Sequence, residues 1–296
     1  MRHGEEHREN NFAGPNPAKA LPHQNTTPQH YNTTQQPPHT IPMPLDTSTY
    51  SLALLRLDGR RWNELRRLTA QISTQASADG SSYLEMGNTK VICTVTGPAE
   101  AKMTGTGGGA GDKALVTVAI SIAGFSGVDR KRRARNDKRV SEMQTTIAEA
   151  FCETLFTHLY PHSTIAISLH VLSQDGSLLA ACLNACTLAL IDAGIPMRDY
   201  ICACTAGSTS SYSSNDEQAD PLLDLNTMEE QELPFLTVAT LGLSDNVSVL
   251  VMETRVQVGR LEGMLAVGVD GCKQVREILD NVVRKRGVKI LEGSQL

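Results

Sequence analysis

The most constraining feature of this sequence is an apolar stretch just past its middle. Residues 177–193 read SLLAACLNACTLALIDA, so apolar side chains would lie on every side of a helix. A helix without a polar face must be covered on all sides by other layers of the fold. Gly194 and Pro196 predict where this helix ends. We therefore expect it to pack closely against sheets.

The pattern around this helix predicts strands and two further helices. Strands rich in apolar and β-branched residues are expected at 68–72, 82–85, 90–96, 115–122, 164–172, 201–205, 235–241 and 247–252. Apolar residues at helical spacing predict helices over 140–159 and 260–286. Gly87 and Asn88 predict a hairpin between the second and third strands. The order predicts the α+β class, with mixed sheets packed against helices in a single domain.

The composition of the chain changes near residue 50. Residues 1–50 are rich in Pro, Gln, Asn, Thr and His, and hold too little apolar surface to offset the entropy of ordering. We predict that 1–50 form a disordered extension and that 51–296 form the ordered domain. The histidines of the extension are too widely spaced to favour a metal-binding tract.

Charge and cysteine content limit the class of protein. The net charge of −5 argues against a protein that coats nucleic acid with its whole surface, but it allows a local basic patch. The cysteines, Cys152 and Cys182 among them, lie mostly in apolar runs, which indicates buried, reduced thiols. Cys202 and Cys204 alternate on a predicted strand, which favours packing over metal binding. No apolar run reaches the length of a membrane helix and no signal segment opens the chain, so we expect a soluble intracellular protein with no membrane contact.

Three segments of the sequence resemble the ribonuclease PH family. They are RLDGRR and NELR at 56–61 and 63–66, ADGS and EMGNTKV at 78–81 and 85–91, and DGS and LALIDAGIPMRD at 175–177 and 188–199. Within the family, the chain resembles ring subunits of the eukaryotic RNA exosome. The resemblance implies the ribonuclease PH fold, a six-membered ring with other exosome subunits of this fold, and RNA in a central channel. It further implies cap subunits and associated nucleases as partners, and residence in nucleus, nucleolus and cytoplasm.

Active members of the family use inorganic phosphate to attack the last phosphodiester of an RNA 3′ end. Such a site must hold two anions, which requires arginine forks, free N–H groups at a helix start and usually a carboxylate-bound metal. The resemblance places the phosphate loop at 175–179, with Leu179 where active members have an arginine. Leucine cannot donate to phosphate, and losing such a donor costs on the order of 100- to 1000-fold in rate. We favour a plain strand-to-helix turn capped by Ser177.

The metal-binding carboxylates implied by the resemblance are two aspartates, six residues apart. The first aligns with Glu230, and the second falls within 233–236, where no acid stands. A single carboxylate holds Mg²⁺ poorly, and we interpret the acidic residues 229–232 as a solvated loop. We therefore predict no catalytic residue, no metal and no cofactor. Ser177, Leu179 and Glu230 would be a vestigial phosphate and metal site.

A basic run precedes the helix expected at 140. It consists of Arg130, Lys131, Arg132, Arg133, Arg135, Lys138 and Arg139. By resemblance, Lys138 and Arg139 align with paired arginines that hold the RNA backbone, and clustered cations suit phosphate neutralisation. We predict RNA contact through Lys138, Arg139, Arg135 and Arg133, with Lys102 in the loop that lines the channel neck in the family. Only Phe125 stands close by as a stacking partner, so binding should follow the backbone and tolerate sequence. A nuclear localisation signal or a solvated loop are the alternative interpretations.

Three functions fit the sequence. The first is a non-catalytic, RNA-guiding subunit of the exosome ring, serving 3′-to-5′ RNA processing and degradation, including ribosomal RNA maturation and messenger RNA turnover. The second is an active phosphate-dependent 3′-to-5′ exoribonuclease, which would need another group in place of the missing arginine. The third, a small RNA-binding module working alone, is disfavoured by the long fold and by the resemblance to ring formers. The pocket expected to join Leu179, Glu230 and Arg139 separates the first two.

Overall fold

The computed structural model describes residues 55–56, 58–100, 113–127, 130, 137–209 and 220–293, which all belong to one compact unit. The disordered extension predicted for 1–50 lies outside these residues. So do Lys102, Arg133 and Arg135 of the predicted RNA contact. No helix within the described ranges is both long enough and apolar enough to cross a membrane.

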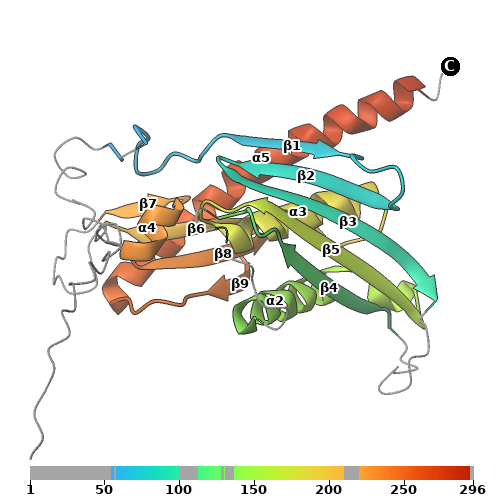
Figure 1. The fold of residues 1–296 in the computed structure, drawn as a ribbon, viewed down its shortest axis with the longest axis horizontal. Helices are drawn as coiled ribbons and strands as arrows, with labels where there is room; N and C mark the ends of the chain where they lie inside the picture. The colour runs from blue at the N-terminus through green and yellow to red at the C-terminus, as the bar shows by residue number, and fades with distance from the viewer. Residues whose placement is uncertain are drawn as a thin grey trace, which may run out of the picture. The chain divides into compact units, whose positions relative to one another are not determined.

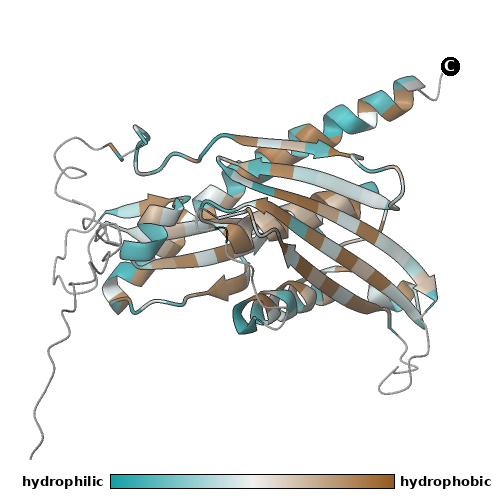
Figure 2. Cartoon of the chain, viewed as in Figure 1, coloured by the Kyte–Doolittle hydropathy of each residue, from teal (hydrophilic) through white to brown (hydrophobic). Residues whose placement is uncertain are grey.

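One sheet, which we call sheet A, holds five strands in the order β1-β2-β3-β5-β4 (Figure 1). The strands are β1 (Leu68–Ile72), β2 (Gly80–Met86), β3 (Thr89–Glu100), β4 (Leu115–Ile122) and β5 (Ser163–Ser173). β1, β2, β3 and β5 pair antiparallel, whereas β4 runs parallel to β5. Apolar residues alternate along these strands (Figure 2), so one face of the sheet is buried.

A second sheet, sheet C, holds four strands in the order β7-β6-β8-β9. They are β6 (Ile201–Ser208), β7 (Pro221–Leu223), β8 (Phe235–Leu241) and β9 (Val247–Val251). Every pairing is antiparallel. All eight residues of β6 are buried, because the sheet is covered there by helices. Cys202 and Cys204 are among them, which confirms that they serve packing.

The apolar helix α3 (Leu178–Asp192) lies between the two sheets, as its sequence requires. It packs against β2 and β3 of sheet A and against β6 of sheet C, and residues 178–190 are buried throughout. The approach to β2 is close: a Cβ on Gly80 would lie 2.2 Å from the carbonyl oxygen of Ala189. The predicted α+β arrangement, with mixed sheets packed on helices, is confirmed.

The remaining helices are α2 (Lys138–Thr154), α4 (Thr227–Glu232), α5 (Val258–Gly293) and a short 3₁₀ helix (Thr157–Leu159). α2 packs on β4, and α5 packs along β6, β7, β8 and β1. The helix predicted over 140–159 stops at Thr154, because Leu155 adopts extended backbone and bridges to Met197. α5 runs past the predicted end at residue 286 and ends at Gly293. Cys152, expected to be buried, is exposed on α2.

A buried amide replaces a missing strand beside β6. The Asn184 side chain of α3 donates to the Ala203 carbonyl oxygen at 2.9 Å and accepts from the Ala203 N–H at 2.8 Å. Thr187 donates to the carbonyl oxygen of Ile201 at 2.7 Å. β7 pairs only with residues 206–208, so these side chains satisfy the backbone where no strand lies alongside.

Candidate functional site

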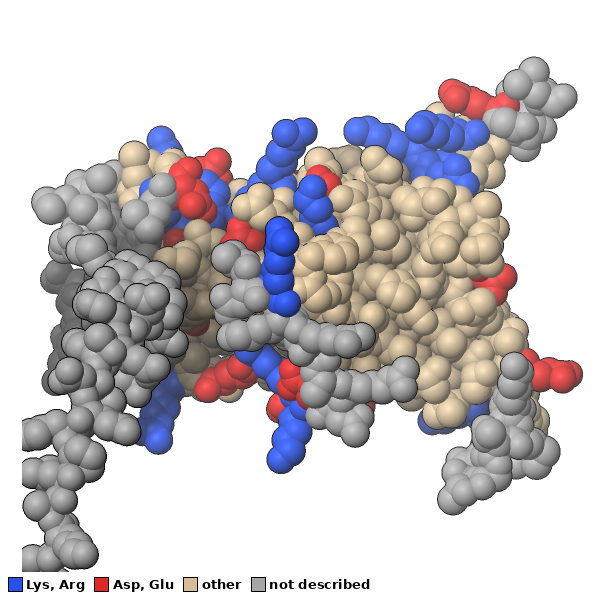
Figure 3. Space-filling view, viewed as in Figure 1, with Lys and Arg blue, Asp and Glu red and all other residues tan. Residues whose placement is uncertain are grey.

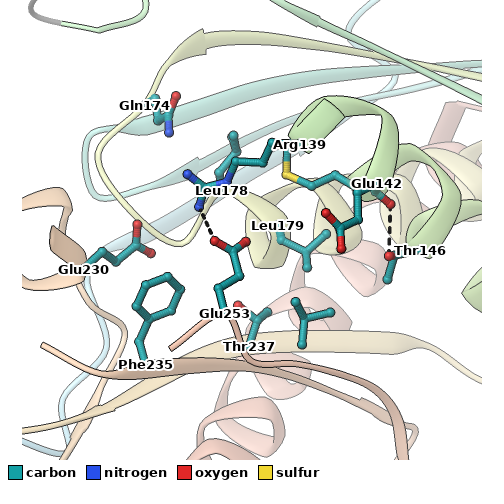
Figure 4. A pocket seen from close by; sticks show the side chains of 12 residues that line it. Arg139, Glu142, Thr146, Gln174, Leu178, Leu179, Glu230, Phe235, Thr237 and Glu253 are labelled. Carbon is teal, nitrogen blue, oxygen red and sulfur yellow. Dashed lines mark hydrogen bonds and ion pairs between the residues drawn. The ribbon is translucent and has the colours of Figure 1, made fainter. Parts of the chain in front are cut away.

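A small cavity of about 50 Å³ opens between the N-terminal part of α2, the first turn of α3, α4 and sheet C (Figure 4). Its lining residues are Arg139, Glu142, Met143, Thr146, Gln174, Leu178, Leu179, Glu230, Phe235, Thr237, Val251 and Glu253. The structure thus brings together Leu179, Glu230 and Arg139, as the sequence predicted. Lys138 is exposed beside it and does not line the cavity.

The turn at 175–177 holds one wall of this cavity. Gly176 has a φ of 76°, and a Cβ there would lie 2.5 Å from the carbonyl oxygen of Leu225, so only glycine fits. Ser177 follows at a φ of 52° and begins α3, but its side chain makes no capping hydrogen bond. The predicted turn is therefore confirmed and the predicted serine cap is wrong. The hydroxyl is instead directed to Asp224 Oδ1, 3.0 Å away.

Asp224 links the segments that surround the cavity. Its carboxylate accepts from the backbone N–H of Arg66 at 2.9 Å and from the Arg66 guanidinium at 2.7 Å. Burial by itself would raise the pKa of Asp224, but the charge and hydrogen bonds of Arg66, with that of Ser177, hold it below its usual range. Arg66 belongs to the NELR segment. This segment of the family resemblance therefore contains a residue that stabilises the fold, through its contacts with Asp224.

The acidic residues 229–232 form no solvated loop, which corrects the prediction. All of them lie on α4, which begins with a capping box: Asn226 accepts from the Glu229 N–H at 3.0 Å, and Glu229 accepts from the Asn226 N–H at 3.1 Å. Glu229 is fully buried and accepts from Arg56 Nε at 2.9 Å. The sequence N-x-x-E at 226–229 was the signal for this helix.

Glu230 occupies one backbone donor at the start of α3. Its Oε1 accepts the Ser177 N–H at 2.5 Å, at the start of α3. Burial raises the pKa of Glu230 to about 7, against opposing contributions from this hydrogen bond and from Arg66. Glu230 therefore keeps its proton to a higher pH than an exposed glutamate does. Leu179, only 9% exposed, supplies an apolar wall beside it.

Glu253 is the residue of this site that sequence reasoning missed. It follows β9 and forms an ion pair with Arg139, with 3.0 Å between Glu253 Oε2 and Arg139 Nη2. In Figure 4 the guanidinium of Arg139 lies over this carboxylate, with Glu230 and Phe235 to one side and Leu179 and Glu142 to the other. No local motif marks Glu253, because only the packing of β9 against α2 brings it here.

The donor atoms of the cavity fit a divalent metal ion poorly. One oxygen of Glu230 is engaged by the Ser177 N–H, and Glu253 is engaged by Arg139. Burial raises the pKa of Glu230, so this carboxyl gives up its proton less readily than an exposed glutamate, which weakens it as a ligand for Mg²⁺. Within the part of the chain that the structure describes, no three His, Cys, Asp or Glu side chains converge on a common point.

The fold and the cavity at the start of α3 define a ribonuclease PH-type protein, and comparisons with known proteins agree. The family described as "3′ exoribonuclease family, domain 1" matches residues 64–196. This chain belongs to that family, the ribonuclease PH family.

Its relatives within the family include exosome components. It is 41% identical to the exosome complex component ski6 of Schizosaccharomyces pombe over 235 residues, covering 79% of this chain and 93% of that protein. It is 41% identical to human exosome complex component RRP41 over 241 residues, covering 80% of this chain and 95% of that protein. The resemblance to the ribosomal RNA processing protein 41 type is thereby confirmed.

Two solved structures show the same fold. Rice Rrp46 superposes with a TM-score of 0.64 at 24% identity, covering 76% of this chain and 98% of that chain. A chain of the Archaeoglobus fulgidus exosome with RNA bound to the active site superposes with a TM-score of 0.63 at 20% identity, covering 78% and 95%. The predicted ribonuclease PH fold is confirmed.

Proposed function

We propose that this protein is a non-catalytic subunit of an RNA exosome ring that contacts RNA during 3′-to-5′ processing and degradation. The similarity to exosome components over about four-fifths of the chain supports the assembly. Cap subunits and nucleases would be further partners, with residence in nucleus, nucleolus and cytoplasm. Imaging a tagged chain tests the residence.

The observation that carries the loss of catalysis is the lining of the cavity. Leu179 presents an apolar side chain at the position where the family resemblance expects a guanidinium. The Ser177 N–H, one of the backbone donors at the start of α3, is bonded to Glu230. The side chains around it are one arginine and three glutamates, a formal charge of −2. An attacking phosphate therefore meets three carboxylates and a single guanidinium, which is already paired with Glu253.

Surface features support an assembly rather than a protein working alone. The edge strand β9 and the residue after it expose Val247, Leu250 and Met252. Apolar side chains on an open sheet edge are typical of a surface that pairs with another chain. The face over sheet A in Figure 3 also carries few charges, as expected where neighbouring subunits pack.

The test of catalysis uses the full chain, alone and assembled with related ring subunits. Single-stranded RNA is incubated with inorganic phosphate, and released nucleoside diphosphates are quantified, with an archaeal exosome as positive control. We expect no phosphate-dependent release. Release that depends on phosphate and disappears in Glu230→Gln would show that the protein is a working exoribonuclease.

The test of RNA contact compares two double variants with equal loss of charge. Lys138→Ala with Arg139→Ala should weaken RNA binding and flatten its salt dependence. Lys285→Ala with Lys289→Ala removes two exposed cations of α5 and is the matched control. Equal effects of both pairs on affinity and salt slope would mean that binding is non-specific.

A further inference from the structure

We propose that Glu253 excludes phosphate groups from the cavity by holding Arg139 in an ion pair. This inference rests on the proposed RNA contact and names a residue that regulates it. The sequence motifs do not include Glu253, and the family resemblance assigned it no role. It lies two residues beyond the end of β9 and lines the cavity.

The ion pair joins two elements across the mouth of the cavity. Arg139 is the second residue of α2, where the Asp137 carboxylate caps the helix by accepting the Arg139 N–H at 3.2 Å. Glu253 lies two residues after β9, and β9 packs against α2. The two side chains are 57% and 47% exposed, so both remain open to solvent. A phosphate oxygen can therefore reach the same guanidinium and compete for it.

The charged residues around Arg139 favour its ion pair with Glu253 over binding of a phosphate. Glu142 and Glu230 line the same cavity, and Arg139 is the one cation among its lining residues. A phosphate that displaced Glu253 would bring at least one more negative charge beside these groups. Like charges brought together in a recess of this kind disfavour binding. RNA phosphates should consequently stay outside the cavity, against the exposed face of Arg139 and Lys138.

The alternative to exclusion is a positioning role, in which the ion pair with Glu253 orients the guanidinium of Arg139 so that it can bind RNA. A guanidinium has five N–H donors, so one ion pair leaves donors for a phosphate. The two roles predict opposite changes in RNA affinity when Glu253 is neutralised. If Glu253 excludes phosphate, its neutralisation strengthens RNA binding, and if it positions Arg139, neutralisation weakens binding.

The experiment measures single-stranded RNA binding to the full chain by fluorescence anisotropy over a salt series. Glu253→Gln keeps the size of the side chain and removes its charge. We expect roughly two- to fivefold tighter binding, the range for release of an exposed ion pair, and a steeper salt dependence. Inorganic phosphate should compete more strongly with RNA in Glu253→Gln than in the unaltered chain.

Asp245→Asn is the matched control, because it removes one exposed carboxylate that pairs with Lys273 at 2.7 Å. If Asp245→Asn tightened RNA binding by the same factor, the effect of Glu253→Gln would be due to net charge alone. That result would overturn the inference. Weaker or unchanged binding of Glu253→Gln overturns it as well. A gain that persists when Arg139→Ala is also present would mean that Glu253 does not act through Arg139.

Failure of this inference is distinguishable from failure of the proposed RNA contact. If Arg139→Ala weakens binding but Glu253→Gln leaves it unchanged, the contact stands and the exclusion by Glu253 is wrong. If Arg139→Ala binds RNA as tightly as the unaltered chain, the RNA contact itself is wrong.

Discussion

The charge of Glu230 should make the stability of this protein depend on pH. A carboxyl whose pKa is higher in the folded than in the unfolded chain binds its proton more tightly when folded. Its ionisation therefore destabilises the fold progressively as pH rises from about 4.5 to about 7. A pKa raised this far corresponds to roughly 3 kcal/mol. Because Glu230 keeps partial contact with solvent, this value is an upper bound.

Replacement of Glu230 by glutamine isolates this effect. The glutamine oxygen can still accept the Ser177 N–H, so the hydrogen bond at the start of α3 is kept while the charge is removed. Relative to the unaltered chain, Glu230→Gln should be equally stable at pH 4.5 and more stable by up to roughly 3 kcal/mol at pH 8.

The assay is urea denaturation between pH 4.5 and pH 8.5, comparing free energies of unfolding of the two chains at each pH. Glu149→Gln makes the same chemical change at an exposed position of α2 and should give no pH-dependent difference. A Glu230→Gln chain that is less stable than the unaltered chain at pH 8 would refute the reasoning. It would mean that the ionised carboxylate stabilises the turn more than burial disfavours it.

Three further substitutions test the framework around the cavity. Asp224→Asn should lower the free energy of unfolding by on the order of 3 kcal/mol in urea denaturation, because Arg66 loses its buried partner; a loss below about 1 kcal/mol would contradict this. Gly80→Ala should cost about 1–3 kcal/mol through its contact with Ala189, whereas Gly259→Ala, with open space around it, should not destabilise. Phe151→Ala should cost about 3–5 kcal/mol by leaving a cavity in the core, measured as a lower melting temperature.

Local patterns were sufficient for most of the secondary structure. The all-apolar helix, the alternating strands and the hairpin at Gly87 and Asn88 were predicted because neighbouring residues determine them. β7 and α4 were missed because they are short, although Asn226 and Glu229 carried a capping signal.

Contacts between distant residues were the part that the sequence could not supply. Ser177 looked like a helix cap, but Asp224, distant in sequence, takes its hydroxyl. Arg56 neutralises Glu229 from the other end of the described chain, which buries an acid that appeared solvated. Glu253 enters the cavity through sheet pairing and helix packing alone.

The amide of Asn184 has a consequence for the width of sheet C. A further strand beside residues 201–205 would fill the space where α3 runs, so the helix could not touch both sheets. Because a single side chain supplies both hydrogen bonds of Ala203, the sheet can end there without leaving its backbone bare. A hydrophobic residue at position 184 would leave the buried N–H and carbonyl oxygen of Ala203 without these two hydrogen bonds.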